Sequence, residues 1–259
     1  MTAAFRDDPL LIGALGGSGT RVFSKIARHA GIHMGAHVDG HEDAKPFSSF
    51  YRENARRYLE QGRRFTPEQC PEVDAALDER VRRHLERLRD PDRRWGVKNP
   101  RSMLLLPYWH ERFPGLRFLH VVRHGLDMAY SDNDNQLRKY GDVVLGDGGE
   151  TSSPERALLY WQEANRVAAD YGEREMGARY ARVRLEELCE DPRATVRRLF
   201  DFFAPADDSG YEAAVAEVGR PGTIGRWREH PAERNARLAE LGREGLARFG
   251  YSAGLYIEA

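Results

Sequence analysis

Two apolar runs, each followed by a glycine and then by helical periodicity, are the clearest pattern along this chain. The first covers residues 10–15 and leads into Gly16-Gly17-Ser18-Gly19-Thr20, after which apolar residues recur at helical spacing. The second covers residues 116–122 and leads into Arg123-His124-Gly125. Both runs are nearly continuous, with Arg117 and His120 the only polar residues, and such runs are typical of parallel strands buried on both faces. The pattern therefore predicts two units of strand, turn and helix.

Shorter apolar segments at 95–97 and 180–183 predict two further strands. Helical segments lie between the strands and supply the crossovers of a mostly parallel sheet. With 259 residues, the chain is long enough to form one core without a disulfide or a structural metal. We expect a single α/β domain that spans residues 1–259.

Three segments outside the strands have a distinct pattern. Residues 71–88 carry apolar positions at helical spacing, which predicts an amphipathic helix. Asp191-Pro192 predicts the N-cap and first residue of a helix that reaches Phe203. Residues 141–153 are rich in glycine and aspartate, and they predict a loop of the kind that covers a substrate.

Charge, apolar runs and cysteine spacing indicate the compartment of the protein and exclude several kinds of partner. The formal net charge is −1, so no overall positive field recruits a nucleic acid or an anionic membrane. No apolar run approaches the roughly 20 residues that span a bilayer, and the N-terminal segment carries Arg6, Asp7 and Asp8 where a signal peptide would be apolar. Cys70 and Cys189 lack the spacing of a zinc or redox motif. We therefore expect a cytoplasmic protein with no metal site, no nucleic-acid partner and no membrane span.

The glycines of the first turn indicate an anion site. Glycine adopts positive φ and lets the backbone approach a ligand, so successive N–H groups and the following helix N-terminus can surround a phosphate or sulfate. The pattern of ordinary ATPases and GTPases ends in Gly-Lys-Ser/Thr, whereas here Gly19 is followed by Thr20-Arg21. The turn therefore argues against an ordinary nucleoside triphosphatase. A purely structural tight turn is the alternative interpretation.

This turn resembles the 5′-phosphosulfate loop of the sulfotransferase superfamily, which has the form Lys/Arg-Ser/Gly-Gly-Thr. Gly17 stands where the family carries a basic residue, and Arg21 follows the loop. The resemblance implies a P-loop-like fold with three α/β/α layers around the parallel sheet. It also implies that the loop binds the sulfuryl donor PAPS (3′-phosphoadenylyl sulfate), whose product is PAP. The implied donor-binding residues of the loop are Gly17, Ser18, Gly19, Thr20 and Arg21.

The second resemblance lies after the second apolar run. Arg123, with Ser131 eight residues on, is similar to the pair that holds the donor's 3′-phosphate in this family. The planar guanidinium suits a phosphate, and a serine two helical turns later can reach the same anion from the helix. The alternative is an arginine that caps a strand and an unrelated surface serine. The agreement of this spacing with the other segments favours the phosphate-binding interpretation.

Two later segments extend the resemblance. Residues 220–227 are similar to the family's Arg-Lys-Gly-x-x-Gly-x-Trp loop, which implies donor contacts from Arg220 and from the N–H of Gly222. Pro221 replaces the lysine of that loop. Residues 184–188 resemble the family's Arg-Tyr-Glu-Asp-Leu segment at the end of a strand. In the family the aromatic residue of this segment can touch adenine, and Leu185 replaces it here.

Lys98 is the expected catalytic cation. Residues 96–100 resemble the Lys-x-Pro segment of many sulfotransferases, in which the lysine contacts the bridging oxygen or the sulfuryl group. Fixed positive charge there stabilises the negative charge that develops on the leaving 5′-phosphate. A solvated surface lysine is the alternative. Lysine is otherwise scarce in this arginine-rich chain, occurring at Lys25, Lys45, Lys98 and Lys139.

The candidates for the general base are Asp39, His41, Glu42 and Asp43. Asp43 is favoured because the segment resembles that of bacterial relatives with an aspartate just before aromatic residues. A polar cluster between two helices is equally typical of a solvated loop. The aromatic and histidine residues of the segment 33–58 are candidates to line the acceptor pocket.

Together these segments predict a sulfotransferase that moves the sulfuryl group of PAPS to a hydroxyl or amine by in-line displacement, with no metal expected. The acceptor can be a small molecule, a glycan or a peptide, and the sequence fixes neither it nor the oligomeric state. Two other functions remain open. A small-molecule kinase would turn over ATP with Mg²⁺. A non-catalytic module that binds PAPS or a sulfated ligand would fit the absence of basic residues at Gly17 and Pro221.

Overall fold

A computed structural model describes residues 6–146 and 153–251. Within these residues, four parallel strands form one sheet in the order β2-β1-β3-β4. The strands are β1 (Leu10–Ala14), β2 (Gly96–Lys98), β3 (Arg117–Val122) and β4 (Tyr180–Arg184). The α-helices are α1 (Thr20–His29), α2 (Lys45–Glu60), α3 (Cys70–His84), α4 (Leu106–Arg112), α5 (Gly125–Ala129), α6 (Asn135–Leu145), α7 (Pro154–Tyr171), α8 (Leu185–Glu190), α9 (Pro192–Phe203), α10 (Tyr211–Ala216), α11 (Ala232–Leu241) and α12 (Arg243–Arg248). Short 3₁₀ or π-helical segments are η1 (Pro100–Leu105), η2 (Gly172–Met176), η3 (Gly177–Arg179) and η4 (Arg226–Glu229).

The sheet brings the carboxyl ends of its strands to one edge. Ile12 of β1 pairs in parallel with Lys98 of β2 on one side and with Leu119 of β3 on the other. Val122, at the end of β3, pairs with Arg184 at the end of β4. All four strands expected from the apolar segments are therefore confirmed. Because ligands of open parallel sheets bind beyond the carboxyl ends of the strands, the residues that follow them are the first candidates for a site.

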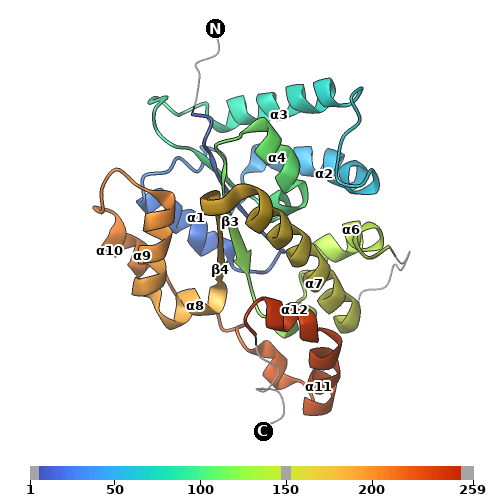
Figure 1. Ribbon diagram of the computed structural model, residues 1–259. Coiled ribbons are helices and arrows are strands. Elements are labelled where there is room, and N and C mark those ends of the chain that lie inside the picture. The colour runs from blue at the N-terminus through green and yellow to red at the C-terminus, as the bar shows by residue number, and fades with distance from the viewer. Residues whose placement is uncertain (1–5, 147–152, 252–259) are drawn as a thin grey trace.

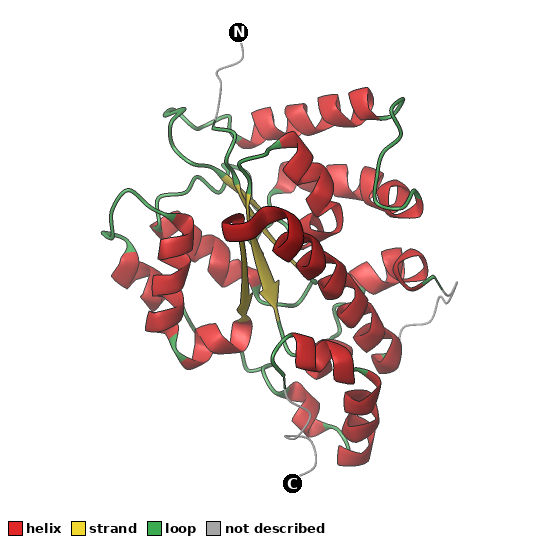
Figure 2. Cartoon of the chain, in the orientation of Figure 1, coloured by secondary structure: helices red, strands yellow, loops and turns green. Residues whose placement is uncertain are grey.

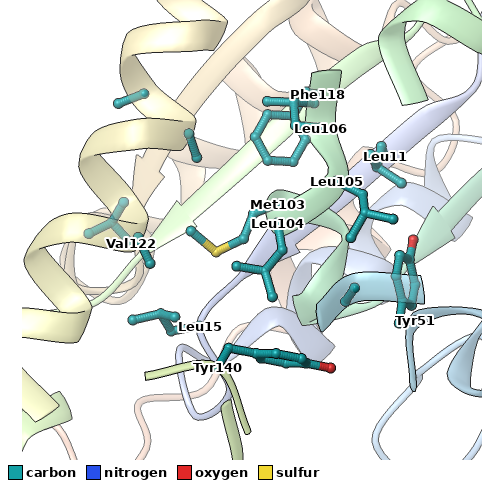
Figure 3. Close-up of a cluster of buried hydrophobic side chains, with 14 of the residues drawn as sticks. Leu11, Leu15, Tyr51, Met103, Leu104, Leu105, Leu106, Phe118, Val122 and Tyr140 are labelled. Atoms are coloured by element: carbon teal, nitrogen blue, oxygen red, sulfur yellow. The ribbon is translucent and has the colours of Figure 1, made fainter. Parts of the chain in front are cut away.

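β1 divides its side chains between two apolar layers. Ile12 packs with Phe23 of α1 and Phe200 of α9 on one face of the sheet. Leu11 packs on the other face with residues from α2, η1, α4 and α7, a cluster shown in Figure 3. Helices thus cover both faces of the sheet (Figures 1 and 2), which confirms the three-layer α/β/α prediction.

Gly13 lets the segment after β2 approach β1 closely. A Cβ at Gly13 would lie 2.9 Å from the backbone nitrogen of Met103, so a larger residue would push η1 away from the strand. η1 begins directly after Lys98-Asn99, and the side-chain oxygen of Asn99 accepts a hydrogen bond of 3.1 Å from the N–H of Arg101. The glycine and this cap together hold Lys98 and Asn99 at the edge of the sheet.

Two predicted helices are confirmed with small differences. The helix expected over residues 71–88 is α3, which ends earlier, at His84, and buries Val73 and Leu77. α9 ends at Phe203 as expected, and the carboxylate of Asp191 accepts a hydrogen bond at its N-terminus. No helix in the described part of the chain is both long enough and apolar enough to cross a bilayer.

The loop expected over residues 141–153 is wrong in its first part, because residues 141–145 form the end of α6. Leu137 and Tyr140 bury one face of α6 in the core, and this packing stabilises the helix in spite of its glycine. Residues 147–152 of the expected loop lie outside the described residues.

Candidate active site

A cavity of about 640 Å³ lies at the carboxyl edge of the sheet. The turn after β1, the first residues of α1, the segment after β2 and residues 217–223 contribute to its walls. The predicted site residues that line it are Gly17, Gly19, Thr20, Arg21, His41, Asp43, Lys98 and Arg123. The predicted residues that do not line it are Ser18, Asp39, Glu42, Ser131, Arg220 and Gly222. The structure therefore brings residues from four separate sequence segments to one cavity.

The turn between β1 and α1 has the backbone geometry of an anion site. Gly17 and Gly19 have φ values of 94° and 77°, a region that favours glycine. A Cβ at Gly19 would also lie 2.8 Å from both δ-carbons of Leu185, so the turn packs closely against the start of α8. Thr20 opens α1 and lines the cavity, which places the N-terminus of that helix beside it. Unpaired N–H groups of a first helical turn attract an anion.

Lys98 and Asp43 form an ion pair at the cavity wall. The Lys98 side chain is 3% exposed, and its Nζ donates to Asp43 Oδ1 at 2.5 Å and to the carbonyl oxygen of His41 at 2.6 Å. The Asp43 side chain is 24% exposed and so remains open to the cavity. The predicted cation and the favoured base are therefore in direct contact.

The other three base candidates differ in position. Asp39 Oδ1 accepts from the backbone N–H groups of His41 and Asp43, at 2.8 and 2.9 Å. Burial raises the pKa of Asp39, but these two hydrogen bonds together with nearby positive charge, including that of Lys98, hold the pKa below its usual value. Asp39 therefore shapes the loop. Glu42 has a φ of 64° and accepts from Arg28 Nε at 3.1 Å, outside the cavity.

His41 lines the cavity, but one nitrogen of its ring is already engaged. The guanidinium of Arg21 lies 2.7 Å from His41 Nδ1. Because a guanidinium can only donate, Nδ1 is the accepting nitrogen in this contact. The arrangement links the end of the glycine turn to the loop that carries Asp43.

Arg123 joins the glycine turn after β1 to the loop of residues 220–225. Its side chain is buried and donates to the carbonyl oxygen of Gly17 at 3.1 Å, to that of Thr223, and to Asp127 Oδ2 at 3.1 Å. Asp127 is fully buried and also accepts from the N–H of Gly225 at 2.8 Å. Arg123 lines the cavity where an anion could be bound, but it also holds the glycine turn and residues 220–225 together.

Both predicted serines face elsewhere in this structure. Ser18 is buried, and its Oγ lies 3.9 Å from the sulfur of Met128. Ser131 was expected on a helix two turns after Arg123, which is wrong because α5 ends at Ala129. Ser131 Oγ instead accepts from the N–H of Asn133 at 3.2 Å. It lies close to the glycine turn, since a Cβ at Gly17 would come within 3.3 Å of it.

The loop of residues 219–225, here called the late loop, contributes alternate residues to the cavity. Gly219, Pro221 and Thr223 line it, whereas the exposed Arg220 lines a neighbouring cavity of about 180 Å³. The structure therefore does not bring Arg220 into the cavity of Lys98. Leu185, at the position where the family carries an aromatic residue, does line the main cavity.

The prediction that aromatic residues of the segment 33–58 line the acceptor pocket is wrong for the aromatic side chains of α2. Phe47, Phe50 and Tyr51 are fully buried in the core, and Tyr58 is 2% exposed. Their helix packs its apolar face against the segment that includes η1, as Figure 3 shows for Tyr51. Core packing therefore explains these aromatic residues.

Eight polar residues that line the cavity were missed by the sequence interpretation: Lys25, Glu217 and Thr223, and five that come from two segments. Of these five, Asn99 and Arg101 lie next to Lys98 in the chain, so the motif itself could have suggested them. The other three belong to the segment before α6 and its first turn, which has no pattern that indicates a site. The five residues are Asn99, Arg101, Asn133, Asn135 and Gln136. Among the described residues, no three His, Cys, Asp or Glu side chains are grouped so as to hold a metal ion.

Comparison with known proteins agrees with this arrangement. The family model described as the sulfotransferase family matches residues 9–208, which include the glycine turn, Lys98 and Arg123. No curated protein matches the chain.

Solved structures of sulfotransferases share the fold. The sulfotransferase domain of the Synechococcus PCC 7002 olefin synthase is 19% identical with a TM-score of 0.57, over 95% of this chain and 94% of that one. A sulfotransferase from Alicyclobacillus acidocaldarius is 15% identical with a TM-score of 0.55, over 97% and 99%. A mouse sulfotransferase complexed with PAP is 13% identical with a TM-score of 0.51, over 93% and 85%. Because the family match covers most of the sequence, this chain belongs to the sulfotransferase family.

Proposed function

We propose that this protein transfers the sulfuryl group of PAPS to a hydroxyl or amine of an acceptor molecule. The observation that carries the proposal is the contact of 2.5 Å between Lys98 and Asp43 at the wall of the same cavity as the glycine turn. An anion site, a buried cation and an accessible carboxylate are the three groups that an in-line sulfuryl transfer requires.

The donor occupies the part of the cavity between the glycine turn and the late loop. The N–H groups of the turn and the first residues of α1 hold the 5′-phosphosulfate, with Arg21 beside them. Arg123 contacts the 3′-phosphate, since it lies between Gly17 and Thr223. Donor contacts from Ser18, Ser131, Arg220 and Gly222 require a rearrangement, because none of these residues lines the cavity. A mouse sulfotransferase of the same fold was solved in complex with PAP, which supports PAPS as the donor.

The reaction then needs one bond formed and one broken. The acceptor oxygen attacks the sulfur, the bond between sulfur and the 5′-phosphate oxygen breaks, and the acceptor proton passes to Asp43. The products are a sulfate ester and PAP. Lys98 stabilises the negative charge on the leaving oxygen. To do so, its Nζ must break its contact with the Asp43 carboxylate and form one with the donor. A sulfuryl group carries less charge than a terminal phosphate, so the scheme includes no metal.

Incubation with isotopically labelled PAPS and a broad acceptor panel tests the proposal. We expect a labelled sulfate ester and an equal amount of PAP. Binding of PAP without labelled product from any acceptor would indicate a non-catalytic binding module. Turnover of ATP with Mg²⁺, and none of PAPS, would indicate a kinase.

A further inference from the structure

We propose that the acceptor is a sugar-like polyol, a molecule with several neighbouring hydroxyl groups, and that phenols and steroid alcohols are poor substrates. This inference rests on the proposed sulfuryl transfer and names the acceptor for the same site. It is based on the chemistry of the lining residues that have no role in the donor scheme.

These residues include several hydrogen-bonding side chains and no aromatic ring, alongside apolar residues such as Val22 and Pro100. Asn99 and Arg101 come from the segment after β2, and Asn133, Asn135 and Gln136 from the segment at the start of α6. No Phe, Tyr or Trp of the described chain lines the cavity. Pockets for flat apolar ligands are lined mainly by apolar and aromatic side chains. This wall instead suits a ligand rich in oxygen.

Two of the amides have a donor with no partner. Asn99 is fully buried, and its oxygen accepts from the N–H of Arg101 at 3.1 Å. Gln136 is 6% exposed, and its oxygen accepts from the N–H of Gly16 at 3.4 Å. In both residues the backbone donor fixes which end of the amide is the oxygen. Asn99 Nδ2 and Gln136 Nε2 are then left buried without a hydrogen-bond partner.

An unpaired buried N–H group favours a ligand that supplies an acceptor oxygen. Arg101 adds a guanidinium to the same wall and forms no ion pair with any described residue. The number of hydroxyl groups then separates the acceptor classes. A phenol or a simple alcohol has one hydroxyl, which the reaction consumes. A polyol can place one hydroxyl next to Asp43 and the sulfuryl group while its neighbouring hydroxyls accept hydrogen bonds from the amides.

The test compares acceptors that differ only in the neighbouring hydroxyls. Methyl glycosides of common hexoses and pentoses are assayed with labelled PAPS against tetrahydropyran-2-methanol, which keeps the ring and the primary hydroxyl, and against p-nitrophenol. We expect kcat/KM for at least one glycoside to exceed both by about 100-fold or more, because a site built to pair a substrate hydroxyl rejects analogues that lack it. Equal or faster transfer to the phenol or the mono-alcohol overturns the inference.

Variants of the two amides give an independent readout. Gln136→Glu and Asn99→Asp keep the accepting oxygen and remove the donor, while Gln136→Met removes the donor without adding charge. We expect the KM for the glycoside to rise about 10–100-fold, with little change for tetrahydropyran-2-methanol and with PAP affinity within about threefold for Gln136→Met. Gln162→Glu is the matched control, because Gln162 likewise accepts from a glycine N–H, that of Gly245, at 3.1 Å but away from the cavity.

The outcomes separate the two proposals. If PAP binds and sulfate passes only to phenols or mono-alcohols, the acceptor inference fails and the proposed function stands. If the Gln136 variants weaken PAP binding and all acceptors equally, the amide serves the donor, and the acceptor inference also fails. If neither PAP binding nor transfer to any acceptor is observed, the proposed function fails and this inference with it.

Discussion

Lys98 Nζ and Asp43 Oδ1 are 2.5 Å apart, so the proposed leaving-group cation and the proposed base neutralise each other in this structure. Lys98 is almost fully buried, and the carbonyl oxygen of His41 is its other partner. A buried ammonium needs such partners, because an unpaired buried charge is strongly unfavourable. Donor binding supplies a second anion for Lys98, and the carboxylate of Asp43 is then free to accept a proton. Binding of the donor and activation of Asp43 as a base are thus linked through the contact between Lys98 and Asp43.

Replacing Lys98 should lower turnover more than donor affinity. In Lys98→Ala, the charge that develops on the leaving 5′-phosphate loses its closest cation, so we expect kcat to fall about 10²–10³-fold. PAP affinity should change by no more than about tenfold, because the N–H groups of the glycine turn remain. Steady-state kinetics and calorimetry measure the two effects, with the exposed Lys139→Ala as the control. A raised donor KM with an intact kcat would show that Lys98 only binds the donor.

The 3′-phosphate should account for much of the donor affinity. We expect PAP to bind at least about tenfold more tightly than AMP, since one charge-assisted hydrogen bond contributes about 1.5–3 kcal/mol. Arg123→Ala should reduce this ratio towards one. The variant should also be less stable by about 3–5 kcal/mol, because Asp127 is fully buried and loses its cation. The ratio of PAP to AMP affinity is measured on the folded variant and is therefore independent of the loss of stability. Equal affinity of the wild type for both nucleotides would contradict the donor assignment.

Buried histidines should make the fold sensitive to mild acid. Burial lowers the pKa of His120 to about 4, although the side chain of Asn165 opposes this shift with a hydrogen bond of 2.9 Å. The unfolded chain binds a proton near pH 6.5 and the folded chain only near pH 4, so stability is full above 6.5 and falls between these values. We expect a loss of about 2 kcal/mol from His120 on going from pH 7 to pH 5.

Urea unfolding at a series of pH values measures this effect. His120→Gln should flatten the curve between pH 6.5 and pH 4, because glutamine does not titrate. His84, whose pKa burial also lowers to about 4, remains in that variant, so part of the slope should persist. A curve that is unchanged by the substitution would show that His120 is not the source of the acid sensitivity.

The sequence predicted the sheet better than the wall of the site. The strands at Leu10–Ala14 and Arg117–Val122 are apolar at most positions, with Arg117 and His120 as the exceptions, and each run is short and followed by a glycine. Such runs are typical of buried parallel strands, so the positions of these strands followed from the pattern. The glycine turn and Lys98 followed from motifs whose spacing is local. Gln136 could not be predicted, because its place at the cavity depends on how α6 packs against the core.

Two errors concern residues whose surroundings their residue type does not reveal. Tyr51 was a candidate for the acceptor pocket, but it is fully buried and hydrogen-bonded to Ser102 at 2.7 Å. Burial raises its pKa well above the usual value, which also makes it unsuited to proton transfer. Ser131 was placed on a helix that ends at Ala129. In both cases the residue type was compatible with function, but burial in the core decided the environment of Tyr51 and the end of a helix decided that of Ser131.

Asp43 is the base in this scheme, and its amide variant tests that role. Asp43→Asn keeps the size of the side chain and removes its ability to take a proton, so we expect turnover on an unactivated alcohol to fall about 10²–10⁴-fold. PAP should bind at least as tightly as to the wild type, because the donor no longer competes with a carboxylate for Lys98. Asp39→Asn and Glu42→Gln should lower turnover far less than Asp43→Asn, because neither side chain lines the cavity and the amide of Asp39→Asn keeps an oxygen that can accept from His41 and Asp43.

The acidity of the acceptor separates proton removal from a change in positioning. If Asp43 removes the proton, the loss in Asp43→Asn should shrink for an acceptor whose hydroxyl is acidified, such as a deoxyfluoro sugar with fluorine next to the reacting hydroxyl. If Asp43 only holds Lys98 in place, the loss should be the same for both acceptors. Near-normal turnover of Asp43→Asn on the unactivated alcohol would move the role to His41, the other base candidate at the cavity wall. Because His41 Nδ1 accepts from Arg21, the ring carries its hydrogen on Nε2, so His41 would have to leave Arg21 and take the proton at Nδ1. His41→Gln should then show the same dependence on acceptor acidity.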